Sequence, residues 1–213
     1  IDQSKIHVIF PGINKPTNIP EGAKAEASTY FLDSFPKIIT VARLDKRKGH
    51  DNILMSIKNL KSKYPNIKYI SIGTGKEQVK LFNLTKKLKL EENVIFLNNI
   101  NYDLKAALVS AANLFIMPSR VENKSVEGFG IVFTEAASFG VGSIGGNEGG
   151  ESDAIIHEET GLICNGNDLN SIYESIITFF KSENYIKFGN NAKNFSKRFH
   201  WNEVVKKYIN LIN

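Results

Sequence analysis

The chain has 213 residues, 42% of them hydrophobic, which is enough for one sizeable α/β domain or two small ones. Lysine and arginine outnumber aspartate and glutamate by 27 to 22, and the net charge of +5 suits a phosphate-bearing ligand but is too small to indicate nucleic-acid binding. The single cysteine, Cys164, excludes an intrachain disulfide, and the four histidines lack metal-ligand spacing, so we expect a reducing, cytoplasmic compartment and no metal site.

The first 36 residues are predicted to be a linker-like start. Residues 12–36 and the positions beside them contain four prolines and a glycine, residue types that interrupt helices and strands: Pro11, Pro16, Pro20, Gly22 and Pro36. We therefore expect a loop or linker there.

From residue 37 onward, short apolar runs alternate with longer segments of helical period. The strand-like runs are KIITVARL, IKYISIG, NVIFLNNI, LFIMPS, a short one near GSIG, and TGLIC. Between the first two, Ile53, Leu54, Ile57 and Leu60 form one apolar stripe, as on an amphipathic helix. Residues 183–213 are predicted to form C-terminal helices. Because the strands are apolar throughout, we expect an α/β fold, a Rossmann-like doubly wound parallel sheet with its ligand beyond the strands' C-terminal ends.

The stretch SVEGFGIVFTEAASFG, residues 125–140, carries the strongest chemical signal. Its glutamates Glu127 and Glu135 bracket seven residues, and Gly128, Phe129 and Gly130 directly precede a predicted helix. Glycine lets the main chain approach a ligand, and the first N–H groups of a helix are unpaired and lie at the positive end of its dipole. The pattern indicates a phosphate seat between two carboxylates that accept from sugar hydroxyls. The alternative is that Glu127 caps the helix and Glu135 forms a surface ion pair.

Basic residues follow the first strand in VARLDKRKGH. Arg43, Lys46, Arg47 and Lys48 stand where this architecture places its ligand, so a guanidinium and an ammonium could neutralise a diphosphate without a metal. Basic residues after strands are often only solvated, which is the alternative.

Other strand ends add weaker signals. In ISIGTGKE, Gly73 and Gly75 have the spacing of the first two glycines of the G-x-G-x-x-G dinucleotide-binding motif, but Gln78 stands in place of the third glycine. We therefore expect a tight turn that lines a nucleotide pocket. FIMPSR brings Ser119 and Arg120 to the same edge, where a base or phosphate could lie. The glycine-rich loop GGNEGG, residues 145–150, follows the next strand.

In this order, the motifs resemble the C-terminal, donor-binding domain of family 4 retaining glycosyltransferases of the GT-B fold. The resemblance runs from VIFPGIN through ITVARLDKRKGHDNIL, NVIFLNNI, LFIMPSR, VEGFGIVFTEA and TGLICNGND to FHWNEVVKKYINL. It implies one nucleotide-sugar-binding domain over residues 1–213. The family's N-terminal domain, which carries the acceptor site and the usual catalytic histidine, is not in this sequence. One departure is GVGSIGG, where the family usually has a proline-containing G-x-P-V run.

The resemblance also implies roles for single residues. Arg43 and Lys48 would bind the diphosphate and stabilise the leaving group, Glu127 would contact the donor sugar, and the absence of a D-x-D triplet agrees with metal independence and no cofactor. The residues implied in binding the rest of the donor are Gly73, Gly75, Ile100 (whose main chain would face the base), Arg120, Gly128, Phe129, Gly130, Ile131, Val132 and, at the ribose, Glu135.

The implied function is hexosyl transfer from a UDP- or GDP-sugar to a sugar or lipid-linked glycan acceptor, in the synthesis of a bacterial-type polysaccharide or glycolipid. VEGFGIVFTEA slightly favours GDP-mannose, and the chain alone is expected to bind donor and to transfer little. Two alternatives are a dinucleotide-dependent oxidoreductase, suggested by GTG, and a noncatalytic nucleotide-binding module. No apolar run reaches the roughly 20 residues that span a bilayer, so we expect a soluble domain. The lysines of KEQVKLFNLTKKLKL leave open a peripheral contact with the inner face of a membrane.

Overall fold

A six-stranded sheet forms the centre of the fold in this computed structural model, which describes residues 5–14, 16 and 18–212. All its strands are parallel, in the order β3-β2-β1-β4-β5-β6. They are β1 (Lys37–Val41), β2 (Lys68–Ile72), β3 (Val94–Leu97), β4 (Leu114–Met117), β5 (Ser143–Gly146) and β6 (Gly161–Cys164). The predicted six strands and the Rossmann-like parallel sheet are confirmed.

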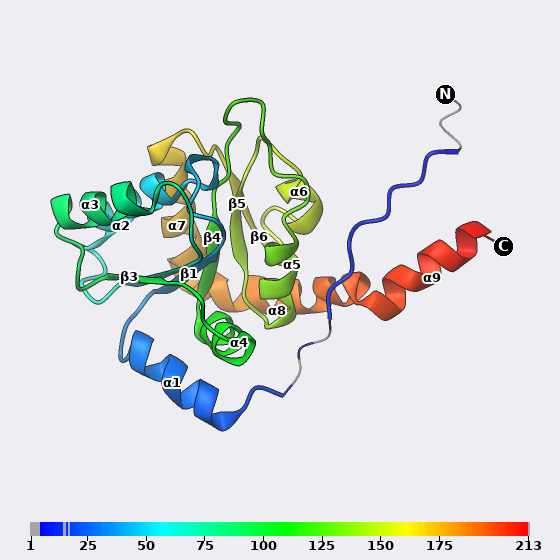
Figure 1. The fold of residues 1–213 in the computed structure, drawn as a ribbon, viewed down its shortest axis with the longest axis horizontal. Coiled ribbons are helices and arrows are strands. Elements are labelled where there is room, and N and C mark those ends of the chain that lie inside the picture. Colours follow the sequence, from blue (N-terminus) through cyan, green and yellow to red (C-terminus); the bar gives the residue numbers. More distant parts are fainter. Residues whose placement is uncertain (1–4, 15, 17, 213) are drawn as a thin grey trace.

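Helices cover both faces of this sheet (Figure 1). One face carries α2 (His50–Leu60), α3 (Gln78–Lys87) and α7 (Leu169–Phe180). The other carries α1 (Glu21–Phe31), α4 (Tyr102–Ala111), α5 (Ile131–Ser138) and the short α6 (Glu151–Ala154). Successive strand residues point to opposite faces, so Ile38 joins the first apolar core and Ile39 the second. Both faces are buried, which explains why the strand sequences do not alternate with polar residues.

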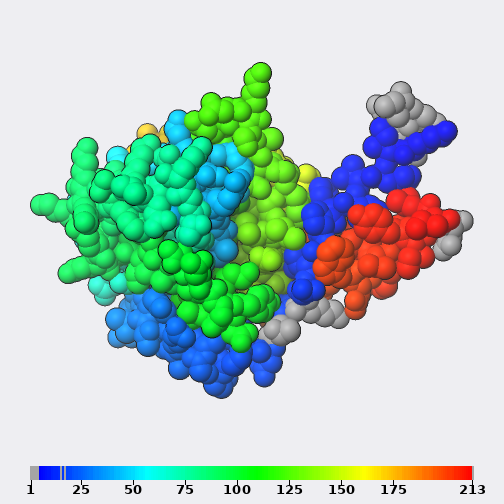
Figure 2. Space-filling model, viewed as in Figure 1, coloured from blue at the N-terminus to red at the C-terminus, as the bar shows by residue number. Residues whose placement is uncertain are grey.

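The C-terminal segment is helical as far as residue 212, as expected, and residue 213, the last of the predicted range, lies outside the described residues. The segment contains α8 (Asn184–Ser196) and α9 (Trp201–Ile212), with 3₁₀ turns at Lys181–Glu183 and Lys197–Phe199. The backbone of Ile13 is hydrogen bonded to Phe199 and to Trp201, so the start of the chain lies against the start of α9. Figure 2 shows this end of the molecule projecting beyond the globular body. No helix in the described ranges is long and apolar enough to cross a bilayer.

The prediction of a loop or linker is wrong for residues 21–31, and where the linker-like start falls on residues 1–4, 15 and 17 it lies outside the described residues. Residues 21–31 form α1, which packs on α4 and buries Ala27 and Phe31. Pro20 stands directly before the first turn, where a missing N–H removes no helical hydrogen bond and the fixed φ favours helix entry. Proline there starts a helix instead of interrupting one.

The strand order reverses between β1 and β4, which neighbour each other although two strands and three α-helices separate them in sequence. In open parallel sheets, the crevice beyond the strands' C-terminal ends at such a point is where ligands bind. The segments that follow β1 and β4 contain VARLDKRKGH and the Glu127 motif. The topology therefore brings the two strongest sequence motifs to one edge of the sheet.

Candidate functional site

The N-terminus of α5 is set by Gly130. Its φ of +75° is left-handed, and a Cβ there would lie 2.6 Å from Cδ2 of Phe133, so only glycine fits without strain. A Cβ on Gly128, in contrast, would meet nothing within 4 Å. No side chain caps α5, and Glu127 therefore does not cap the helix as the alternative reading required. The first N–H groups of α5 face the edge where the strands end.

Glu127 lies against two basic side chains from the segment after β1. Its Oε2 accepts a hydrogen bond from Arg47, at 3.0 Å, and another from the ammonium of Lys48. A 3₁₀ turn, Lys46–Lys48, holds both cations, and all three side chains are nearly buried. Burial by itself would raise the pKa of Glu127, but Lys48 and Arg47 outweigh it and hold that pKa below its ordinary value. The cluster therefore keeps an anion and two cations at the sheet edge.

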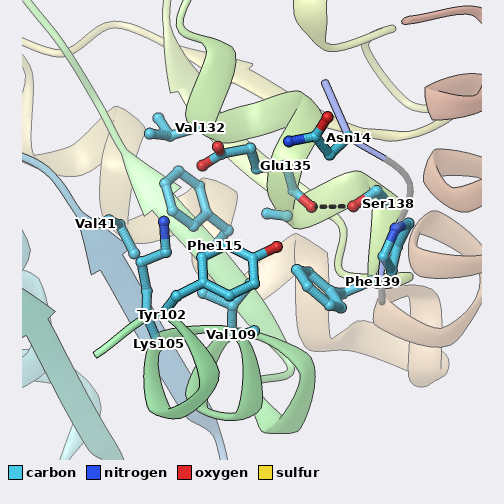
Figure 3. Close-up of a pocket in the computed structure, with 13 residues that line it drawn as sticks. Asn14, Val41, Tyr102, Lys105, Val109, Phe115, Val132, Glu135, Ser138 and Phe139 are labelled. Carbon is cyan, nitrogen blue, oxygen red and sulfur yellow. Dashed lines mark hydrogen bonds between the residues drawn. The ribbon is translucent and has the colours of Figure 1, made fainter. Parts of the chain in front are cut away.

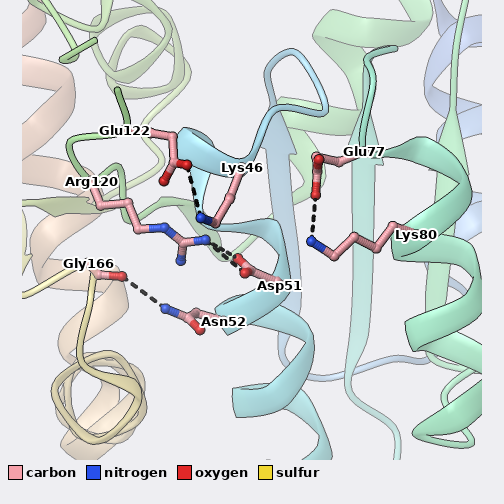
Figure 4. Close-up of polar contacts among 8 residues, drawn as sticks. All are labelled: Lys46, Asp51, Asn52, Glu77, Lys80, Arg120, Glu122 and Gly166. Carbon is pink, nitrogen blue, oxygen red and sulfur yellow. Dashed lines mark hydrogen bonds and ion pairs between the residues drawn. The ribbon is translucent and has the colours of Figure 1, made fainter. Parts of the chain in front are cut away.

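A cationic cavity of about 670 Å³, including space open to solvent, adjoins this cluster. Its lining comes from the segments after β1, β2 and β4: Arg43, Asp45, Lys46, Arg47, Lys76, Glu77, Glu122, Asn123 and Ser125. The side chain of Arg43 is largely exposed, and its one ion pair within the described residues is with Asp45 at 3.3 Å, so most of its guanidinium is open to a ligand anion. Lys46 pairs with Glu122 at 2.9 Å, and Lys80 with Glu77 at 3.0 Å (Figure 4).

A second cavity, of about 570 Å³ including open space, lies between α4 and α5. Figure 3 shows Glu135 of α5 and Lys105 of α4 directed into it, beside Tyr102. Glu135 forms no ion pair within the described residues, which contradicts the surface ion pair of the alternative reading. Val41 lines this cavity and Arg43 the cationic one, so the end of β1 and the residues just after it contribute to both.

The backbone that carries Arg43 is held from inside the core. His50 is buried, with Nε2 at 3.2 Å from the carbonyl of Arg43 and Nδ1 at 3.0 Å from the hydroxyl of Tyr69. Burial, only partly opposed by the Arg43 carbonyl, lowers the pKa of His50 to about 4. The ring is thus neutral near pH 7, and because a carbonyl can only accept, Nε2 carries the proton.

The other predicted binding residues are placed differently. Arg120 is buried and its Nη2 contacts both oxygens of Asp51, at 3.0 and 2.8 Å, so it joins α2 to the loop after β4 and lines neither cavity (Figure 4). Gly73 and Gly75 pack against backbone after β1, since a Cβ on Gly73 would lie 2.1 Å from the carbonyl of Ala42. The side chain of Ile100 packs on the apolar core. These four positions have structural explanations that need no ligand.

Sequence reasoning missed three features of the site. Arg47 stood in the basic motif but had no assigned role, although it contacts Glu127 directly. Tyr102 and Lys105 follow the same strand as Ile100, and their position in the first turns of α4 was the available signal. Glu151, at the start of α6, is fully buried behind the cluster, and nothing in the sequence distinguishes it from a surface carboxylate.

The model of the family described as glycosyl transferases group 1 matches residues 23–195. The chain belongs to this family. A GDP-mannose-dependent alpha-(1-6)-phosphatidylinositol monomannoside mannosyltransferase of Mycobacterium tuberculosis is 29% identical over 177 residues, covering 81% of this chain and 46% of that protein. A glycosyltransferase structure from Rickettsia africae superposes with a TM-score of 0.82 at 21% identity, over 99% of this chain and 57% of that one. The structure of Anabaena HepE in complex with UDP and glucose superposes with a TM-score of 0.81 at 20% identity, over 97% of this chain and 56% of that one.

Membership of the group 1 glycosyltransferases sets aside the dinucleotide-dependent oxidoreductase. The expected fold, one half of a GT-B enzyme, is confirmed by the parallel sheet and by the glycosyltransferase structures that superpose on it. The chain spans about half the length of the relatives described above.

Proposed function

We propose that this chain is the donor-binding domain of a retaining glycosyltransferase that uses a UDP- or GDP-sugar. The observation that carries the proposal is the cluster of Glu127, Lys48 and Arg47, which lies beside the glycine turn before α5 and adjoins the cationic cavity through Arg47. The cationic cavity suits a diphosphate, and the cavity at Glu135 suits a hydroxylated nucleoside. The mannosyltransferase relative depends on GDP-mannose, and HepE was crystallised with UDP and glucose, which supports this donor class.

The proposed chemistry is electrostatic. As the bond between sugar and diphosphate breaks, negative charge grows on the leaving group, and Arg43, Lys48 and the N-terminus of α5 would stabilise it. Glu127 would accept from donor-sugar hydroxyls and Glu135 from the ribose. Side chains and main chain supply the positive charge in this scheme, so we propose catalysis without a metal or cofactor.

The acceptor belongs to the part of the enzyme outside this chain. We propose a sugar or lipid-linked glycan acceptor, held by an N-terminal domain, and little or no transfer by this domain alone. The mannosyltransferase relative acts on a phosphatidylinositol mannoside, and a lipid-linked acceptor would place a cytoplasmic enzyme at the membrane surface. The lysines around α3 would provide that peripheral contact.

Calorimetric titration with UDP-glucose and GDP-mannose tests the donor site. We expect saturable binding of at least one, and a loss of about tenfold or more in affinity for Arg43→Ala and for Glu135→Ala, because each removes a charge-assisted contact. Lys187→Ala and Glu174→Ala, at exposed positions of α8 and α7, make the same charge changes away from the cavities and should bind as wild type.

Two results would contradict the proposal. Failure of a full nucleotide-sugar panel to saturate the chain would remove the donor function. Unchanged affinity in both site variants would remove these residues from the donor site while leaving the family membership intact.

A further inference from the structure

Glu151 is a buried acid that the proposed reaction does not use. Its side chain is 0% exposed, and neither carboxyl oxygen has a hydrogen-bond partner within ordinary geometry. The hydroxyl of Ser119, beside it, is also buried and unpaired. Buried polar groups in folded proteins are nearly all hydrogen bonded, so an unpaired carboxyl behind a cluster of charges calls for a physical explanation.

The glycine-rich segment 145–150, which comprises the end of β5 and the loop after it, makes room for this side chain. A Cβ on Gly145 would lie 3.1 Å from the Cβ of Glu151, and a Cβ on Gly149 would lie 2.5 Å from its Oε2. Any larger residue at Gly149 would displace the carboxyl. The glycines of GGNEGG are therefore explained by packing, because they let the main chain lie directly against the side chain of Glu151.

The same loop connects Glu151 to Glu127. The N–H of Gly150 donates to the carbonyl of Glu127 at 3.0 Å, and a Cβ on Gly149 would lie 2.7 Å from that carbonyl oxygen. The backbone of Gly149 is thus held between the carboxyl of Glu151 and the main chain of Glu127. A shift of the Glu151 carboxyl would be passed through this loop to the residue that contacts Lys48 and Arg47.

The charges that face Glu151 favour its uncharged form. Burial and, to a smaller extent, the negative charge of Glu127 raise the pKa of its carboxyl, whereas its own backbone, Ser119 and Lys48 oppose the rise, and the resulting pKa is about 7. From β6, Cys164 faces it as a thiol, whose pKa is raised to about 12 by burial, Glu151 and Asp168. The loop after β1 contributes the cations already described, β5 has no ionisable side chain, and α5 has no acidic or basic residue in its first turn.

We propose that Glu151 is a positioning residue for the donor site, one that works as an uncharged acid: it supports the loop behind Glu127 and leaves Lys48 paired with Glu127. This inference rests on the proposed function, since it concerns the same donor site. An ionised Glu151 would be a second carboxylate competing for Lys48, and its charge would repel the donor diphosphate. Donor binding should therefore weaken as Glu151 loses its proton.

The test is the affinity of the chain for UDP-glucose or GDP-mannose from about pH 6 to about pH 8, measured by calorimetry. These diphosphate diesters have no titrating group in this range, so the protein determines the slope. If only the protonated form binds, wild-type affinity falls about tenfold over this interval, because the protonated fraction falls by that factor around a midpoint near 7. Glu151→Gln, an uncharged isostere, should bind as the wild type does at the acidic end and lose the slope.

Asp153→Asn is the matched control, because it removes a carboxylate from the same helix at an exposed position and should keep the wild-type slope. A wild-type slope in Glu151→Gln would overturn the proposal. If that variant does not fold, or if neither donor binds, carbon-13 NMR of the wild-type glutamate carboxyls decides. One carboxyl should titrate near pH 7, and the Glu127 resonance should follow it. The absence of such a titration, or a Glu127 resonance that does not respond, would overturn the proposal independently of donor binding.

Discussion

His50 shows how one buried side chain connects the core to the proposed donor site. Its Nε2 donates to the carbonyl of Arg43, and its Nδ1 lies near the hydroxyls of Tyr69 and, at 3.4 Å, Ser71. Burial keeps the ring neutral, so Nδ1 is left as an acceptor for one of these hydroxyls. The proton on Nε2 holds the carbonyl of Arg43, whose side chain lines the cationic cavity.

This protonation state predicts how stability changes with pH. The pKa of His50 is about 4 in the fold against 6.5 for a free histidine, so the unfolded chain binds a proton first as pH falls. Stability linked to His50 is therefore complete above about pH 6.5 and is lost as the pH falls towards 4, by up to about 3 kcal/mol. Urea unfolding of the wild type and of His50→Gln across this pH range measures the loss, as the change with pH in the difference between their unfolding free energies. The exposed His7→Gln variant is the control, and a wild-type curve parallel to that of His50→Gln would refute the assignment.

At the scale of elements, α5 brings the carboxylates and the glycine turn together, and Gly130 fixes how the chain enters it. Gly130→Ala places a Cβ at 2.6 Å from Phe133 on a left-handed backbone, so we expect a loss of about 1–3 kcal/mol in unfolding free energy and weaker donor binding. Gly128→Ala adds the same methyl group where nothing lies within 4 Å and should cost little stability. Thermal unfolding of the two variants makes the comparison. Equal melting temperatures would show that the turn does not need its left-handed residue.

The elements also show what a sequence can reveal. The six strands were predictable because runs such as KIITV are β-branched and bounded by turns, and the parallel order follows from helices lying between them. Helix α1 lies outside the prediction because proline interrupts most helices, whereas Pro20 stands directly before the first turn. Glu127 and Glu135 could be found from their spacing around the glycines. The burial of Glu151 and the pairing of Arg120 with Asp51 are tertiary facts with no local signature, so no pattern in the sequence could have predicted them.

For the whole molecule, the distribution of charge is more informative than its sum. Residues 58–89 contain nine lysines and one acid, Glu77, a net charge of +8; since the chain carries +5, the remaining residues carry −3. This segment runs from the end of α2 through β2 and α3, at one end of the sheet. Val79 and Phe82 are exposed on α3 among these lysines. On a surface helix, lysines are attracted to anionic lipid headgroups, and apolar side chains between them can enter the membrane interface. This arrangement therefore favours contact with an anionic lipid surface.

The expected outcome is salt-dependent binding of the chain to vesicles of mixed phosphatidylglycerol and phosphatidylcholine, and none to phosphatidylcholine alone. Replacing Lys86, Lys87 and Lys89 with alanine should lower the affinity for the anionic vesicles, measured by co-sedimentation, by about a hundredfold. Each lysine near such a surface contributes about 1 kcal/mol to the binding free energy. The matched control removes three exposed lysines at the other end of the sheet, Lys187, Lys193 and Lys197. Because both triple variants lose the same net charge, an equal loss in the control would mean that overall charge, and not the α3 surface, holds the protein on the membrane. The proposed donor site is at the strand ends, and none of the three replaced α3 lysines lines either cavity, so nucleotide-sugar affinity should be the same in both variants.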